Sequence, residues 1–165
     1  MIVLQRLLWF AGLVLLQVLV LNNVHIGSYA SPFLYIYFVL ALDADCSRSE
    51  TLLWGFALGL AVDIFSNTPG LNASATTFLA LARDPLLRSQ APRDAAEDFS
   101  PSIRTMGFSP YVRYIFAAVL LHTSALQLLD FFTFSRPLPL LWRILSDAAV
   151  TMVCIISIDF MRRKR

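Results

Sequence analysis

Long apolar runs separated by short polar stretches make up most of the chain. The runs cover residues 4–22, 29–42, 51–65, 71–82, 111–134 and 138–160. A helix of about 20 apolar residues is long enough to cross the hydrocarbon core of a bilayer. The pattern therefore predicts an all-α integral membrane protein, a six-helix transmembrane bundle that forms one transmembrane domain over residues 1–165.

The third and fourth runs are shorter than the others. As helices, residues 51–65 and 71–82 would reach about 22 and 18 Å, whereas the hydrocarbon core is about 30 Å thick. The turn-forming residues 66–70 separate them. The pair is therefore expected either to tilt across a thinned bilayer or to enter and return as a re-entrant hairpin.

The first two runs begin differently. The first run could be a cleaved signal peptide, because residues 28–30 place small side chains at the spacing of a cleavage site. Its start carries only one charge, Arg6, and the chain that follows also looks membrane-embedded, which favours a retained span. In the second run, Ser31 and Pro32 suit the N-cap and first position of a helix.

Composition separates this chain from soluble proteins. Hydrophobic residues make up 58% and charged residues 15% of it, and the mean hydropathy is +0.67. Soluble domains carry about 45–50% apolar and about 25% charged residues. Cys46 and Cys154 lack the spacing of metal ligands, and the net charge of +2 does not indicate a nucleic-acid partner. A soluble enzyme, a disordered tail and a disulfide scaffold are all disfavoured.

Basic residues are distributed unequally between the predicted loops. With the N-terminus inside, the inner side holds eleven Lys and Arg residues and the outer side holds Arg136 alone. Cytoplasmic loops of membrane proteins carry an excess of Lys and Arg. Loop 83–110, the basic tail 161–165 and both termini are therefore predicted to be cytoplasmic. The tail could also bind anionic membrane lipid.

Gly55 and Gly59 stand four residues apart, and Asp63 follows at the same spacing. Small residues let helix backbones approach closely, so the two glycines predict a helix-packing face. A carboxylate within a membrane segment needs a partner or a function. Asp63 is interpreted either as a cap that accepts hydrogen bonds from the turn at residues 66–70 or as a contact for a ligand or partner.

Further charged residues in the last two runs gather near their outer ends. Counting about 1.5 Å per helical residue places Asp130, Arg143 and Asp147 in the outer half of the membrane, at the level that Asp63 approaches. Arg143 and Asp147 are one turn apart and are expected to pair. The four residues predict either a structural ion-pair network or a polar pocket for a ligand or partner.

The remaining polar and aromatic residues indicate no chemistry. His122 is isolated in an apolar run and is expected to be a packed, hydrogen-bonded core residue. Tyr35 and Tyr37 are interpreted as part of an interfacial aromatic belt. The chain contains no nucleophile motif, phosphate loop or zinc motif. The sequence therefore predicts no catalytic residue, no metal and no cofactor, and a protein that is not an enzyme.

One stretch resembles a known family. Residues 59–73 read GLAVDIFSNTPGLNA. They are similar to the signature of the rod shape-determining protein MreD family, and Thr68, Pro69, Gly70 and Asn72 match its turn. The last apolar run with its basic tail is also similar. The adjacent Pro and Gly and the long polar insert most resemble the Bacteroidetes-type branch of that family.

The resemblance implies a non-catalytic membrane scaffold of the bacterial cell-elongation machinery, which maintains rod shape and peptidoglycan synthesis. It implies an inner (cytoplasmic) membrane location beside MreC, the MreB filament, RodA and its transpeptidase partner. It also implies a fold similar to the substrate-binding subunits of energy-coupling-factor transporters. The alternative is such a subunit itself, serving a small, vitamin-type molecule. Those subunits should carry Ala-x-x-x-Ala on the first helix, where this chain has only Ala11 and Gly12, which favours the scaffold.

Overall fold

The computed structural model describes residues 3–23, 31–92, 98–130 and 137–162, and every regular element within them is a helix. The long helices are α1 (Val3–Leu19), α3 (Arg48–Ser66), α4 (Leu71–Gln90), α6 (Phe108–Asp130) and α7 (Pro137–Arg162). The short ones are η1 (Leu21–Asn23), η2 (Leu34–Ile36), α2 (Tyr37–Leu40) and α5 (Ile103–Met106). The all-α class is confirmed for the described residues.

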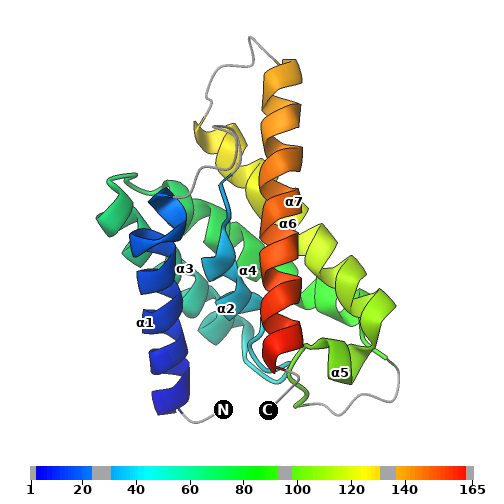
Figure 1. Cartoon of the computed structure of the whole chain (residues 1–165). Helices are drawn as coiled ribbons and strands as arrows, with labels where there is room; N and C mark the ends of the chain where they lie inside the picture. Colours follow the sequence, from blue (N-terminus) through cyan, green and yellow to red (C-terminus); the bar gives the residue numbers. More distant parts are fainter. Residues whose placement is uncertain (1–2, 24–30, 93–97, 131–136, 163–165) are drawn as a thin grey trace.

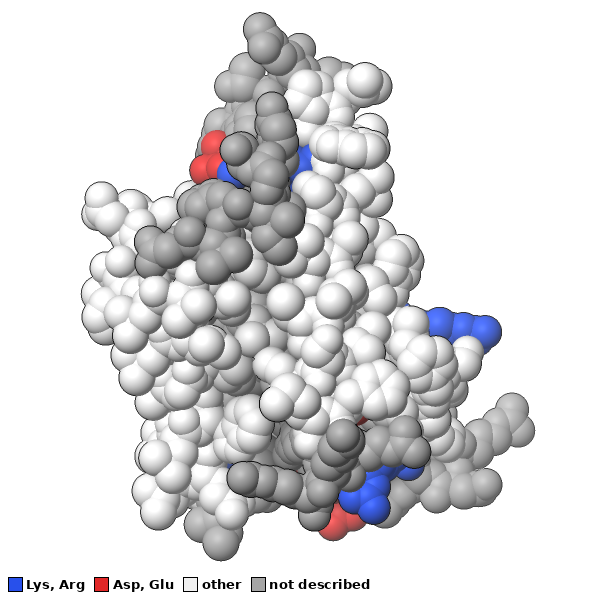
Figure 2. All heavy atoms as spheres, viewed as in Figure 1, with Lys and Arg blue, Asp and Glu red and all other residues white. Residues whose placement is uncertain are grey.

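Within the described residues, three helices are long and apolar enough to cross a membrane: α3, α6 and Leu138–Met161 of α7. At about 1.5 Å per residue they measure about 28, 35 and 36 Å, against a hydrocarbon core of about 30 Å. On the face shown in Figure 2, charged side chains gather at both ends of the molecule. The broad band between them is almost free of charge, with one basic side chain at its edge. Both features are compatible with a membrane protein.

The helices run between two ends of the molecule (Figure 1). The starts of α1 and α3 and the end of α7 lie at one end, called here the lower end. The ends of α1, α3 and α6 and the starts of α4 and α7 lie toward the opposite, upper end. The first and last helices therefore have their outer termini on the same side, as both-termini-inside topology requires.

A polar layer closes the lower end. Arg6 of α1 donates hydrogen bonds to Asp43, at 3.0 Å, and to Glu50 at the start of α3. Ser100 also donates to Asp43. Burial alone would raise the pKa of the Asp43 carboxyl, but the hydrogen bonds from Ser100 and Arg6 outweigh it and lower that pKa below its ordinary value. The ionised carboxylate therefore ties three parts of the chain together.

The second apolar run is not the regular helix that the sequence predicts. The expected helix start at Ser31 is wrong, because residues 31–33 are non-helical and helical structure begins at Leu34. Only η2 and the four-residue α2 follow, and every residue from Leu34 to Leu42 is buried. The segment therefore lies inside the molecule, between the long helices, rather than against lipid.

Side chains from other helices make this irregular segment possible. Buried backbone N–H and C=O groups need hydrogen-bond partners wherever no helix supplies them. Gln17 of α1 accepts from the Leu34 N–H at 2.9 Å and donates to the Pro32 carbonyl at 2.9 Å. Other side chains bond further backbone groups of the segment. Thr151 accepts from the Phe33 N–H, Tyr114 donates to the Leu40 carbonyl and Arg83 donates to the Leu42 carbonyl.

The fourth run is longer than expected, and the loop predicted to begin at Arg83 starts later. Helix α4 continues through Arg83 and Pro85 to Gln90. Arg83 is fully buried; its guanidinium pairs with Asp84 at 3.1 Å and donates to the carbonyls of Leu42 and Asp43. With 19 and 20 residues, α3 and α4 are about 28 and 30 Å long. The expectation of two short segments was wrong: α3 begins before its apolar run, at Arg48, where Ser47 caps it, and α4 continues past its run because the charge of Arg83 is used inside the fold.

Gly55 and Gly59 lie where α3 crosses α4. A Cβ added at Gly55 would lie 2.8 Å from the Cβ of Ala80 and 3.1 Å from the carbonyl oxygen of Thr76. A Cβ at Gly59 would lie 2.5 Å from the Cα of Ala73, with the Thr76 hydroxyl and another backbone atom closer still. Glycine is therefore required for the backbones to approach this closely.

Candidate functional site

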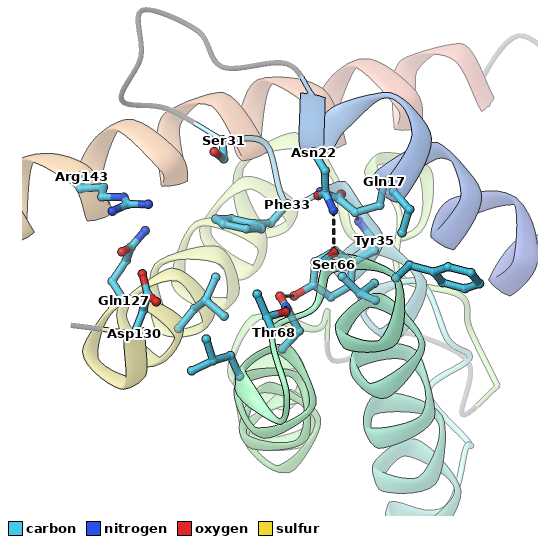
Figure 3. Close-up of a pocket in the computed structure, with 16 residues that line it drawn as sticks. Gln17, Asn22, Ser31, Phe33, Tyr35, Ser66, Thr68, Gln127, Asp130 and Arg143 are labelled. Atoms are coloured by element: carbon cyan, nitrogen blue, oxygen red, sulfur yellow. Dashed lines mark hydrogen bonds between the residues drawn. The ribbon is translucent and has the colours of Figure 1, made fainter. Parts of the chain in front are cut away.

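A cavity of about 410 Å³ lies toward the upper end of the molecule, and Figure 3 shows the side chains that line it. It is bounded by the end of α1, residues 31–35, the corner between α3 and α4, and the facing parts of α6 and α7. The polar residues that line it are Gln17, Asn22, Ser31, Tyr35, Ser66, Thr68, Asn72, Gln127, Asp130 and Arg143. The apolar lining residues are Val18, Phe33, Val62, Phe65, Leu71 and Leu126.

Asp63 forms one wall of the site as the cap of α4. One carboxylate oxygen accepts from the Thr68 hydroxyl at 2.8 Å and from the backbone and side-chain amides of Asn72 at 3.0 and 2.9 Å. The other accepts from the Ala73 N–H at 2.8 Å. Asp63 is therefore a cap, although its backbone donors are in the first turn of α4 rather than in the preceding turn.

The turn between α3 and α4 follows from its residues. Asn67 ends α3 with φ of 54°, in the left-handed region that Asn tolerates at a helix C-terminus. Gly70 precedes α4 with φ of 83°, where a Cβ would be strained. Between them, Thr68 and Pro69 bring the chain round so that the backbone N–H groups of the first turn of α4 meet Asp63. The motif residues Thr68, Gly70 and Asn72 thus form one closed corner.

A hydrogen-bond chain leads from this corner into the core. Because both Asn72 amide hydrogens go to Asp63 and Thr68, its side-chain oxygen is free to accept, and the Tyr35 hydroxyl donates to it at 2.8 Å. His122 Nε2 lies 3.1 Å from the same hydroxyl. Since the Tyr35 proton is already used, His122 must donate through Nε2–H. His122 is a packed, hydrogen-bonded core residue as expected, whereas the interfacial position expected for Tyr35 and Tyr37 was wrong, because both are buried.

Asp147 has different direct partners from those the sequence predicts. Its carboxylate accepts from the Ser31 backbone N–H at 2.8 Å and from the Gln127 side-chain amide. The expected direct partner, Arg143, acts on it through its positive charge and lines the cavity itself. Asp147 therefore holds the start of the irregular segment against α6 and α7.

The structure brings the predicted cluster together only in part. Asp130 and Arg143 face the cavity from α6 and α7 (Figure 3). Asp147 and Asp63 stand behind its lining, the first bonded to Gln127 and the second to Thr68 and Asn72. The four charges therefore form one polar region around a cavity rather than a single ion-pair network.

Two lining residues went unrecognised in the sequence. Gln17 bonds Asn22 at 3.0 Å, and Asn22 donates to Ser66 at 2.7 Å, which joins the end of α1 to the end of α3 (Figure 3). A signal was present, because Gln17 is the only strongly polar residue between Leu7 and Leu21. A buried amide within an apolar run needs partners, and here its partners are the cavity wall and the irregular segment.

This arrangement is suited to binding. The carboxylates of Asp63 and Asp147 accept hydrogen bonds from groups of the cavity wall, and Asp130, Arg143 and several amides and hydroxyls line the cavity. Comparisons of the chain with protein-family models, with curated proteins and with solved structures find no match.

Proposed function

We propose that this chain is a non-catalytic membrane scaffold of the bacterial cell-elongation machinery, of the MreD type. In this proposal it docks MreC and works beside the MreB filament, RodA and its transpeptidase partner. The observation that carries the proposal is the corner at residues 59–73, whose sequence resembles the MreD signature. Asp63, Thr68 and Asn72 of that corner are used to hold α3 and α4 together, which suits a motif that maintains a docking framework.

We further propose that the protein spans the bacterial inner membrane several times with both termini in the cytoplasm. The unequal distribution of basic residues supports this topology, as does the position of the start of α1 and the end of α7 at one end of the molecule. Alkaline phosphatase fused after Arg165 should be inactive, whereas a sandwich fusion at Asn22 should be active. The reverse pattern would contradict the topology.

The scaffold proposal is tested by complementation and capture together. In a rod-shaped host depleted of its own MreD and supplied with a matching MreC, the tagged chain should restore rod shape and retain MreC in mild detergent. The variant Gly59→Leu is the folding-defective control, because its side chain cannot fit between α3 and α4. A chain that accumulates normally in the membrane but neither captures MreC nor restores shape would refute the proposal.

A second candidate function, the substrate-binding subunit of a vitamin-type transporter, is favoured by the cavity. Its volume of about 410 Å³ lies in the range of small-molecule sites, about 300–1,000 Å³. The matching experiment is uptake of labelled vitamins by cells that express the chain with an energy-coupling module. Uptake that depends on Arg143 and Asp130 would support transport over the scaffold.

A further inference from the structure

The cavity presents opposite charges from two neighbouring helices. Asp130 ends α6, and Arg143 stands in the second turn of α7. In Figure 3 the side chain of Gln127 lies beside both of them, deeper along α6. A ligand that fits this part of the cavity would therefore meet a carboxylate, an amide and a guanidinium within one small volume.

The side-chain oxygen of Gln127 is a hydrogen-bond acceptor to which no described group donates. It is 2% exposed, and its amide nitrogen is committed to Asp147. This bond fixes the orientation of the amide group, because a carboxylate oxygen takes the N–H side. Among the described residues, its oxygen Oε1 is buried without a hydrogen-bond partner. An unsatisfied buried acceptor costs free energy, which a bound N–H or O–H group would recover.

We propose that the cavity binds a zwitterion that carries a primary ammonium group and an anionic group a few bonds apart. The ammonium donates to Gln127 Oε1 and Asp130, and the anionic group pairs with Arg143. A quaternary ammonium would fit less well, because it has no N–H to donate to the amide oxygen. The ethanolamine head group of a phospholipid and a free phosphoethanolamine molecule share this chemistry, and a cavity of about 410 Å³ is large enough for either.

The ligand is tested on the full-length chain in nanodiscs that contain equal amounts of phosphatidylethanolamine and phosphatidylcholine. These lipids share a phosphate and differ in whether the ammonium can donate a hydrogen bond. Native mass spectrometry after release into mild detergent should show at least about tenfold more retained phosphatidylethanolamine. Added phosphoethanolamine distinguishes the two sources, because it should displace the lipid or bind directly only if the free zwitterion is recognised.

Three variants locate the binding groups. Asp130→Asn removes the charge that faces the ammonium and should reduce the preference about tenfold, whereas Asp130→Glu should keep most of it. Arg143→Gln should reduce retention of both lipids, because it removes the partner of their shared phosphate. The control is Arg113→Gln, an exposed residue of α6 that does not line the cavity and should behave like the unmodified chain.

The results separate this proposal from the scaffold proposal. Asp130→Asn removes a negative charge from a helix C-terminus, where it is unfavourable, so the fold should be retained. MreC capture is measured on the same variants and is expected to be unchanged. Equal retention of both lipids without binding of phosphoethanolamine would overturn the zwitterion site, as would a preference that is the same in Asp130→Asn, Asp130→Glu and the unmodified chain.

Discussion

Replacing Gly59 by Ala tests whether the contact between α3 and α4 holds the fold together. In an exposed helix this change would stabilise the protein by about 1 kcal/mol, because Ala is the better helix former. Here the new Cβ would lie 2.5 Å from the Cα of Ala73. The neighbouring atoms include backbone, which cannot rotate away, so α3 and α4 must separate. Overpacking of this kind costs about 1–3 kcal/mol.

Separation of the helices would also lengthen the hydrogen bonds from Asn72 and Ala73 to Asp63, and loss of a helix cap costs about 1 kcal/mol. The gain in helix propensity, about 1 kcal/mol, offsets the loss of the cap, so we expect Gly59→Ala to lower the free energy of unfolding by about 1–3 kcal/mol. The assay is thermal unfolding in detergent, in which the remaining folded protein is measured as the height of the monodisperse peak in size-exclusion chromatography.

Two other glycines provide a graded control. Around Gly12 of α1 there is open space within 4 Å, so Gly12→Ala should be neutral or slightly stabilising. Gly55→Ala should be intermediate, because its new Cβ would meet the Cβ of Ala80 at 2.8 Å. Unchanged stability in Gly59→Ala, or the same small effect at all three positions, would refute the close contact as the reason for glycine.

Three further predictions concern buried carboxylates. Asp147→Asn should be mild because the amide oxygen still accepts from the Ser31 N–H, and Gln127 can turn its side-chain oxygen to accept from the new NH2 group. Asp147→Leu leaves the Ser31 N–H and the Gln127 amide without partners and should cost about 2–4 kcal/mol of unfolding free energy. Asp63→Ala should reduce the folded fraction in membranes at least as strongly, measured by chromatography. Asp43 has a lowered pKa, so its stabilisation is present above about pH 4 and is lost as pH falls through the lower native value. The difference between the thermal unfolding midpoints at pH 7 and at pH 3.5 should therefore be smaller in Asp43→Asn than in the unmodified chain.

The sequence alone determined the features that depend on neighbouring residues. The apolar runs that became α3, α6 and α7 were recognisable because a spanning helix needs only a long stretch of apolar side chains. The glycine pair and the corner at residues 66–72 were recognisable because close approach and positive φ restrict the residue type within a few positions. For the same reason Asp63 could be interpreted as a cap from its own surroundings.

Only the tertiary structure decided the course of residues 31–42. An apolar run of this length is equally compatible with a helix and with a buried irregular segment. The outcome depends on whether other helices supply partners for its backbone, and Gln17, Thr151 and Arg83 do so from α1, α7 and α4. The sequence suggests that the charged residue Arg83 lies in a loop. In the fold Arg83 is a buried hydrogen-bond donor, so α4 can continue through it.

The partner of Asp147 shows the same limit at the site. Helical spacing correctly placed Arg143 near it, but its backbone donor, Ser31, stands 116 positions away in the sequence. Spacing rules describe neighbours on one helix, whereas a buried carboxylate takes whichever donors the packed helices bring to it. The sequence therefore determined the types of residue that line the cavity. The packing of α6 and α7 around the irregular segment decided which of them form hydrogen bonds with one another.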